Sequence, residues 1–362
     1  MMINSNYLKS LLLVSLVIFT GQVSAKDNSA TNRAHAVMQE FFDGSGTPGL
    51  SVSVGLGDAI VWSEGFGYAD LEQGVKVDPA RTRFRIGSVI KSMTAFAAAQ
   101  LVDAGKLDLE VPIQTYVPDF PEKRGTISTR QLLGHLSGIR HYGAGEFFSR
   151  EHYGNVTAGL VIFKDDPLLG MPGDAYQYSS YGYNLASAVI ESAAGQDYLL
   201  YMVDHVFKPL GMENTVPDYL AQITPGRGRY YYRDDAGNVL NAPEVDNSYK
   251  WASGGVVGTS NDLVRFGLAQ LAENFISDTT RKMFWTEQTT NSGETTGYGL
   301  GWRIITDETG SLWIGHTGGS VGGTTSFWIL PEHELVIAAI SNLSSFNYDN
   351  VLVTLKDIFT DQ

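Results

Sequence analysis

The chain has 362 residues, of which 43% are hydrophobic, and this is enough to fill the core of one large domain or two closely joined ones. Its formal net charge of −14 argues against nucleic acid or an anionic membrane as a partner. The absence of cysteine excludes disulfide bonds and a lipid-bearing N-terminal cysteine.

Residues 1–25 have the layout of a secretory signal peptide. Lys9 supplies a positive charge, residues 11–20 form a short apolar run, and Val23-Ser-Ala25 supplies small residues for cleavage. The apolar run is too short to cross a bilayer as a helix, which takes about 20 residues. We therefore expect export by a Sec-type signal, cleavage after Ala25, a periplasmic or secreted mature protein, and no permanent membrane span.

Beyond the signal, strand patterns occur near both ends of the chain and helix patterns occupy the middle. The N-terminal part predicts a helix at 34–42 and a β-hairpin with strands at 49–55 and 59–62. Apolar spacing then predicts helices at 88–104, 129–134, 182–194, 199–207 and 260–272. The C-terminal part predicts strands at 298–305, 312–314, 324–330 and 335–341, and a closing helix at 348–359.

This order predicts an α+β fold, in which strands from both chain ends form one antiparallel sheet flanked by helices. We expect the sheet domain to comprise residues 26–87 and 250–362. The residues between them, 88–249, form a mainly helical insertion.

A serine and a lysine lie three residues apart at the start of one predicted helix. In Ser88-Val-Ile-Lys91, positions i and i+3 share a helix face, so the two side chains lie close together. The helix start also favours a developing negative charge at the serine. A lysine in a poorly solvated cleft can lose its proton and then accept one from the serine hydroxyl.

Two further motifs follow at separations of about 90 and 138 residues. Tyr178-Ser-Ser180 directly precedes a predicted helix, and its aromatic neighbours are also compatible with a packed core. His316-Thr-Gly-Gly319 is a glycine-rich step on a predicted strand, where missing side chains would let a substrate backbone lie against the strand edge.

In this order and at these spacings, the three motifs resemble the serine β-lactamase and penicillin-binding-protein superfamily. The tyrosine motif points to its class C branch. Other matching segments bring the chain close to bacterial relatives of the mitochondrial serine β-lactamase-like proteins; they are Phe84–Lys91, residues 105–109, residues 132–139, His141-Tyr142, residues 246–251 and residues 254–262.

The resemblance implies a serine hydrolase that acts through an acyl-enzyme, with its active site at the junction of the two regions. Ser88 would be the nucleophile, and Lys91 and Tyr178 would share proton transfer. The backbone N–H groups of Ser88 and Gly319 would form the oxyanion hole. The substrate-binding residues would be Ser180, His316, Thr317 and Gly318. No cofactor or metal is implied, and the natural acyl donor and the oligomeric state stay open.

Two positions depart from the class C pattern. Ser180 stands where most class C enzymes have an asparagine that holds the side chain of a β-lactam. His316 stands where β-lactamases usually have a permanently charged lysine, whereas histidine is mostly uncharged at neutral pH. Both departures favour peptide (including D-amino-acid peptide) or ester substrates, with genuine β-lactam hydrolysis as the alternative.

Three other interpretations compete with this one. Gly318-Gly-Ser-Val-Gly322 fits the Gly-x-Ser-x-Gly pattern of α/β-hydrolases, with Ser320 as nucleophile and His333 as base, but the residues that follow predict a strand instead of the required helix. A metalloenzyme is disfavoured because no His-Glu-x-x-His motif is present, and His135 and His141 are interpreted as structural. A catalytically inactive peptidoglycan-binding or self-assembling module has no reason to retain Ser88, Lys91 and Tyr178 together.

Overall fold

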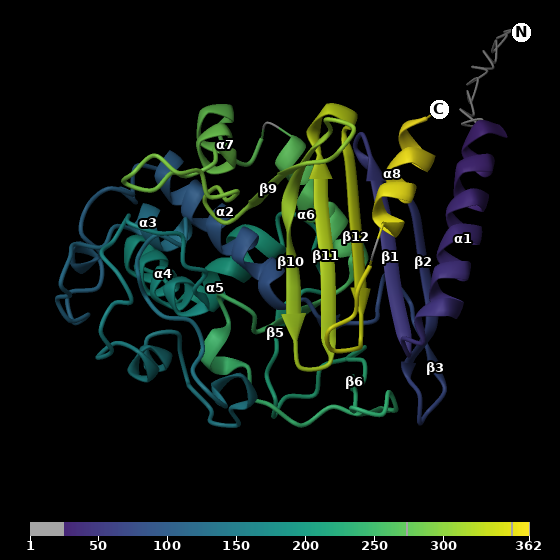
Figure 1. Cartoon of the computed structure of the whole chain (residues 1–362), viewed down its shortest axis with the longest axis horizontal. Helices are drawn as coiled ribbons and strands as arrows, with labels where there is room; N and C mark the ends of the chain where they lie inside the picture. Colours follow the sequence, from purple (N-terminus) through teal and green to yellow (C-terminus); the bar gives the residue numbers. More distant parts are fainter. Residues whose placement is uncertain (1–24, 273, 349, 362) are drawn as a thin grey trace, which may run out of the picture.

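The computed structural model describes residues 25–272, 274–348 and 350–361. Its main feature is a seven-stranded antiparallel sheet in which strands from both chain ends pair side by side (Figure 1). In chain order, the strands are β1 (Gly49–Leu56), β2 (Ala59–Asp70), β3 (Val75–Lys76), β9 (Arg303–Thr306), β10 (Leu312–Ser320), β11 (Gly323–Leu330) and β12 (Leu335–Ser341). Their spatial order is β3-β2-β1-β12-β11-β10-β9, as an α+β fold with a sheet from both ends requires.

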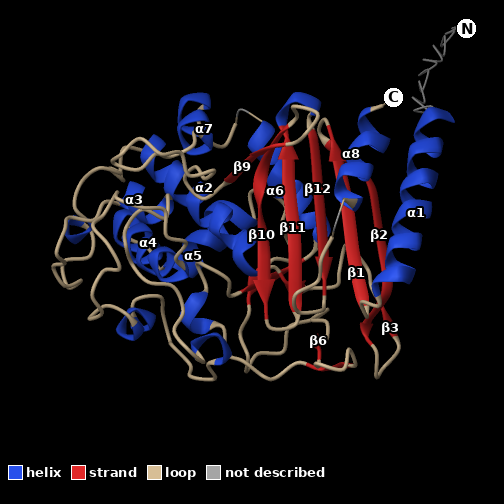
Figure 2. Ribbon diagram, viewed as in Figure 1, coloured by secondary structure: helices blue, strands red, loops and turns tan. Residues whose placement is uncertain are grey.

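Helices cover both faces of this sheet (Figure 2). The first and last helices, α1 (Ala25–Ser45) and α8 (Val351–Thr360), pack on one face, and α6 (Ser260–Leu271) packs on the other. The strands supply alternate residues to the two faces: in β11, for example, Phe327 belongs to the core with α6, and Trp328 to the core with α8. Each face therefore has its own apolar core.

The residues between the two halves of the sheet are mainly helical and lie beside the sheet in Figure 1. They contain α2 (Ile90–Asp103), α3 (Thr129–Leu133), α4 (Ser180–Ala194), α5 (Tyr198–Tyr201), the π-helical turn η5 (Met202–Phe207), and the 3₁₀ turns η1 (Gly87–Val89), η2 (Ile113–Thr115), η3 (Glu146–Phe148), η4 (Ala158–Ile162) and η6 (Ser248–Lys250). Two small sheets accompany them, formed by β4 (Phe84–Arg85), β8 (Val256–Gly258) and β5 (Val216–Pro217), and by β6 (Tyr231–Arg233) and β7 (Val239–Asn241). Helix α2 is buried along most of its length, so it is the central helix.

Most predicted elements are present, and three differences have local causes. The predicted strand at 298–305 begins only at Arg303, because the Gly299 N–H bonds to the Trp302 carbonyl and Gly301 has a φ of +88°. The helix predicted at 199–207 divides into α5 and a wider turn, η5. A helix absent from the prediction, α7 (Asp278–Trp285), begins after Ser277, whose side chain accepts the Thr280 N–H.

The predicted signal peptide lies outside the described residues except for Ala25, where α1 begins.

The strand after Ser320 bears on the competing α/β-hydrolase interpretation. Because β10 turns directly into β11, this serine is not on the strand-to-helix turn which that interpretation requires. Within the described residues, no helix combines the length and the apolar character needed to cross a membrane.

Candidate active site

Ser88 lies in η1, the tight turn through which the chain enters α2. Its side chain is half-buried and lines a cavity. Gly87, directly before it, has a φ of +52°, a left-handed conformation that glycine adopts more readily than other residues. The sequence predicted that a helix begins at Ser88, and a 3₁₀ turn followed by α2 occupies this position. This arrangement presents the hydroxyl at the N-terminal end of the central helix.

Lys91 follows one turn later, and its side chain is completely buried. Its Nζ lies 2.9 Å from Ser88 Oγ, 3.1 Å from Ser180 Oγ and 2.6 Å from the carbonyl oxygen of Ser253. Among the described residues, no carboxylate forms an ion pair with Lys91. Burial is the main reason that the pKa of Lys91 is held well below its ordinary value, and the positive charges of Lys250 and Arg303 lower it further.

Tyr178 lies in the loop just before α4, and its ring centroid is 4.9 Å from Lys91 Nζ. Burial is the largest influence on the phenol and raises its pKa well above the ordinary value, so Tyr178 keeps its proton at neutral pH. The Ser88 side chain interacts with the Tyr178 phenol and opposes the rise of its pKa. The structure thus brings together Ser88, Lys91 and Tyr178, which are as many as 90 positions apart in the chain.

Two histidines support the loop that carries Tyr178. Their ring centroids lie 4.3 Å (His135) and 5.5 Å (His141) from the centroid of the tyrosine ring. His135 Nδ1 accepts the Ser179 N–H at 3.1 Å, and His141 Nδ1 accepts the Ser180 N–H at 3.1 Å. The sequence singled out both histidines only as structural. The backbone bonds that they make depend on tertiary contacts that no local motif encodes.

The glycines of β10 pack directly against the turn that carries the serine. A Cβ atom at Gly318 would lie 3.1 Å from the Ser88 nitrogen, and one at Gly87 would lie 2.7 Å from the Gly319 nitrogen. Side chains would therefore separate these two backbone segments. Gly319 lines the same cavity as Ser88, so the two N–H groups belong to facing segments beside the serine hydroxyl.

His316 and Thr317 lie away from the wall of that cavity. His316 is completely buried; its Nδ1 donates to the Thr317 carbonyl at 2.6 Å, and its Nε2 accepts from the Tyr298 hydroxyl at 2.9 Å. Burial, with the charges of Lys91 and Arg303, holds the pKa of His316 well below its ordinary value, so the ring is neutral. The Thr317 side chain is exposed and lines a separate cavity that includes Trp313 and Trp328.

Ser180, in contrast, lines the cavity with Ser88 and is also in contact with Lys91. The cavity has a volume of about 410 Å³. Its other lining residues come mostly from loops; they are His141, Tyr142, Phe147, Phe148, Lys250, Ser253, Gly254, Gly319, Ser320, Val321, Thr324, Ser344 and Ser345. This cavity is the candidate active site.

The sequence did not identify the roles of Lys250 and Ser253, although both lie in or beside segments that carry the resemblance. The Ser253 carbonyl accepts from Lys91, and its hydroxyl donates to Asn184 Oδ1 of α4 at 2.9 Å. Lys250 lies in the cavity wall. The sequence Lys250-Trp-Ala-Ser253 has no local signature of a site, because only the packing of this loop on α2 and α4 gives these residues their positions.

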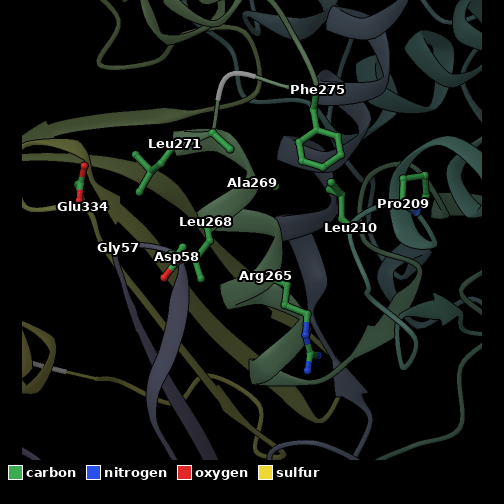
Figure 3. A pocket seen from close by; sticks show the side chains of 11 residues that line it. Gly57, Asp58, Pro209, Leu210, Arg265, Leu268, Ala269, Leu271, Phe275 and Glu334 are labelled. Carbon is green, nitrogen blue, oxygen red and sulfur yellow. The ribbon is translucent and has the colours of Figure 1, made fainter. Parts of the chain in front are cut away.

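A larger cavity, of about 610 Å³, lies elsewhere (Figure 3). Leu268 and Ala269 of α6 line one side of it, and Pro209 and Leu210 line another. None of the residues predicted from the sequence to act in catalysis or binding is among those that line it. The larger cavity is therefore separate from the serine–lysine pair.

Comparison with known proteins identifies the family. The family model described as Beta-lactamase matches residues 34–356. The serine beta-lactamase-like protein LACTB, mitochondrial, of Homo sapiens is 33% identical over an alignment that covers 86% of this chain and 74% of that protein.

Solved structures share the fold. The octameric penicillin-binding protein homologue from Pyrococcus abyssi superposes with a TM-score of 0.77 at 24% identity, covering 91% of this chain and 77% of that one. A D-stereospecific amidohydrolase from Streptomyces superposes with a TM-score of 0.76 at 23% identity, covering 91% and 99%. With its sheet, its serine–lysine pair and a family match over most of its length, this chain belongs to the beta-lactamase family of serine hydrolases.

Proposed function

We propose that this protein is an active serine hydrolase that cleaves peptide or ester bonds through an acyl-enzyme formed on Ser88. The observation that carries the proposal is the contact of Ser88 Oγ with Lys91 Nζ at 2.9 Å, because this amine is buried and has no carboxylate partner among the described residues. A lysine in such surroundings is a base near neutral pH, and a serine hydroxyl beside a base is an activated nucleophile.

Lys91 Nζ lies within hydrogen-bond distance of three oxygens, and after loss of its proton the neutral amine can still donate to two of them. Such an amine has two N–H donors and one lone pair. The Ser253 carbonyl can only accept, and Ser180 Oγ can accept the second N–H, so the lone pair is left for the proton of Ser88. In acylation, Ser88 Oγ forms a bond to the substrate carbonyl carbon while its proton moves to Lys91 Nζ.

Tyr178 then has the role of the acid. Its raised pKa keeps the hydroxyl protonated before reaction, and its interaction with Ser88 and its ring's distance of 4.9 Å from Lys91 Nζ support a position near the reacting carbon. When the bond from carbon to the leaving nitrogen or oxygen breaks, Tyr178 gives its proton to the leaving group and recovers one from the Lys91 ammonium. Water then attacks the acyl-enzyme, and its proton returns to Ser88 through the same groups.

The N–H groups of Ser88 and Gly319 would stabilise the oxyanion formed in both steps. The close packing of η1 on β10, which glycine at positions 87 and 318 makes possible, supports this assignment. Removal of one such donor typically costs about 2.7–4 kcal/mol of transition-state stabilisation.

Peptide and ester substrates are favoured over β-lactams by two features of the site. His316 is neutral and buried, so it cannot replace the lysine cation of β-lactamases. The hydroxyl of Ser180 is engaged with Lys91. Among proteins with this fold, the Streptomyces amidohydrolase is D-stereospecific, which makes D-amino-acid amides the first peptide substrates to test.

The proposal is tested by hydrolysis of a 4-nitrophenyl ester, a D-alanine 4-nitroanilide and a penicillin by the wild-type chain and two serine variants. We expect turnover of the ester or the anilide and its loss in Ser88→Ala, with an acyl adduct visible by mass spectrometry in the wild type. Ser320→Ala is the matched control, because Ser320 lines the same cavity. Loss of turnover only in Ser320→Ala would overturn the proposal, and rapid turnover of penicillin alone would identify a β-lactamase.

A further inference from the structure

Lys250 is a second buried lysine in the candidate active site, and the mechanism above does not use it. It ends the short turn η6, is 1% exposed and forms part of the cavity wall. A methyl group at Gly254 would lie 3.6 Å from Lys250 Cδ and 3.9 Å from the carbonyl carbon of Gly87. The lysine stem and the residue that precedes Ser88 therefore both lie next to Gly254.

Within the part of the chain that the structure describes, Lys250 forms no ion pair. Asp218 is the carboxylate whose negative charge acts on Lys250. It is already paired with two arginines, because Arg85 Nε lies 2.8 Å from one of its oxygens and Arg227 lies 3.2 Å from the other. Asn247 also donates to Asp218 at 2.7 Å. The carboxylate is thus already compensated by other residues.

Aromatic rings surround the ammonium group instead. Nζ lies 4.2 Å from the ring centroid of Phe147, 5.2 Å from that of Tyr249 and 5.6 Å from that of Tyr142. These contacts give partial compensation, because cation–π attraction is weaker than pairing with a carboxylate. Burial lowers the pKa of Lys250 to about 7, so below this pH the lysine is an ammonium group that can attract an anion.

The charges of the residues that line the cavity also favour binding of an anion. Among the described residues that line it, Lys250 is the only lysine or arginine, and none is an aspartate or glutamate. The chain as a whole has a net charge of −14, so a cavity wall with a lysine and no acidic residue contrasts with the rest of the protein. Burial lowers the pKa of the neighbouring His141 to about 4, so this residue adds no positive charge at neutral pH.

From this arrangement we infer that Lys250 binds a carboxylate of the substrate, and that the enzyme prefers acyl donors or leaving groups that carry one. The inference rests on the proposed function and specifies its substrate class. One ammonium group among neutral rings matches a singly charged anion better than a phosphate, which is usually bound by several donors or by arginine. The aromatic and glycine-lined walls would hold the uncharged remainder of the substrate.

Two matched pairs of esters test the inference. In the first pair, the charge is on the acyl side: 4-nitrophenyl hydrogen glutarate is compared with its methyl ester. In the second, it is on the leaving side: 4-carboxyphenyl butyrate is compared with 4-(methoxycarbonyl)phenyl butyrate. Each comparison gives a ratio of kcat/KM for the charged over the neutral ester, after subtraction of the uncatalysed rate.

We expect the wild-type chain to favour the charged member of at least one pair by about tenfold or more, as a charge-assisted hydrogen bond in a buried site would give. Lys250→Met should bring this ratio to about one, and Lys250→Arg should retain part of it. Lys106→Met is the control, because it removes a lysine that is exposed, and it should keep the wild-type ratio.

Hydrolysis of all four esters with ratios near one in the wild type would overturn the inference and leave the proposed function intact. Failure to hydrolyse any ester, together with failure to react with a fluorophosphonate, would overturn the proposed function itself. If Lys250→Met does not fold, the wild type provides the answer: free glutarate should slow fluorophosphonate labelling of Ser88 and dimethyl glutarate should not. Equal effects of the two compounds would contradict the inference.

Discussion

Lys91 Nζ lies 2.9 Å from Ser88 Oγ, and the same nitrogen lies 2.6 Å from the Ser253 carbonyl, a group that can only accept a hydrogen bond. The first distance follows from helix geometry, because positions i and i+3 share a face. The second depends on a loop that begins more than 150 positions later. Together they orient a buried amine toward the serine, and the following predictions test the consequences.

Lys91→Met should slow the reaction of Ser88 with a fluorophosphonate by about 10²–10⁴-fold, the usual contribution of a general base. The temperature of unfolding should stay unchanged or rise, because the substitution removes a buried amine that has no carboxylate partner among the described residues. Labelling rates and thermal unfolding measure the two effects, with Lys106→Met as the control. Labelling of Lys91→Met at the wild-type rate would refute its role as the base.

Tyr178→Phe should affect amides more than activated esters. The phenyl ring keeps the packing on His135 but lacks the hydroxyl that gives a proton to the leaving group. Turnover of a 4-nitroanilide should fall by about 10²–10⁴-fold, and that of a 4-nitrophenyl ester by less, since 4-nitrophenolate leaves without a proton.

Tyr176→Phe is the matched control, because its ring centroid also lies near His135, at 5.8 Å. An equal loss on the two substrates in Tyr178→Phe would show that this tyrosine does not act as the acid for the leaving group.

Gly87→Ala should disrupt the proposed oxyanion hole. The added Cβ would lie 2.7 Å from both the nitrogen and the oxygen of Gly319, at a φ of +52°. Gly105→Ala has a similar backbone cost, of roughly 1–2 kcal/mol, at a φ of +66°, but its Cβ would meet open space. Urea unfolding should show a larger loss of stability for Gly87→Ala, and only this variant should lose fluorophosphonate labelling. Similar behaviour of the two variants would contradict the close approach of η1 and β10.

The preference for charged esters should depend on pH. Burial, with the charge of Arg85, lowers the pKa of Lys250 to about 7, and Asp218 opposes this shift. Because a lysine is protonated below its pKa, the charged-to-neutral kcat/KM ratio should be highest at acidic pH and fall as pH rises through about 7. The ester carboxylate stays ionised over this range. The charged and titratable groups around Lys250 are Arg85, Lys91, His141, Tyr142, Asp218 and Tyr249.

Both members of an ester pair use the same Ser88 chemistry, so titration of Lys91 affects their rates equally and cancels in the ratio. The measurement is therefore kcat/KM for each ester between about pH 6 and pH 9. A ratio that is constant across this range would exclude Lys250 as the group that recognises the carboxylate.

Local patterns predicted the parts of this molecule that local physics determines. The contact of Ser88 with Lys91 needs only one helical turn, and the strands of the sheet needed only alternation, as in β1, or a short apolar run, as in β12. The strand predicted at 298–305 was wrong over its first half, because a turn at Gly299 and Gly301 interrupts an apolar run. An apolar run has the same pattern in a continuous strand and in a strand that a turn interrupts, so the pattern alone does not show where the strand begins.

The remaining residues of the site could not be derived from local patterns. Tyr178 was placed beside Ser88 only through resemblance to a known family. Lys250 lies in a segment that carries the resemblance, but no local pattern assigned it a role, because its significance depends on the lack of a carboxylate partner among the described residues in three dimensions. His316 is a different case: its departure from lysine was visible in the sequence, but its burial and its bond to Tyr298 were not.

The central claim, that Ser88 is an activated nucleophile, is tested most directly by intact-mass spectrometry after exposure to a fluorophosphonate. The wild-type chain should gain a single phosphonyl adduct, and peptide mapping should locate it on Ser88. Ser88→Ala should gain none, and Ser320→Ala should behave as the wild type does. An unmodified wild-type chain, or an adduct that persists in Ser88→Ala, would contradict the claim.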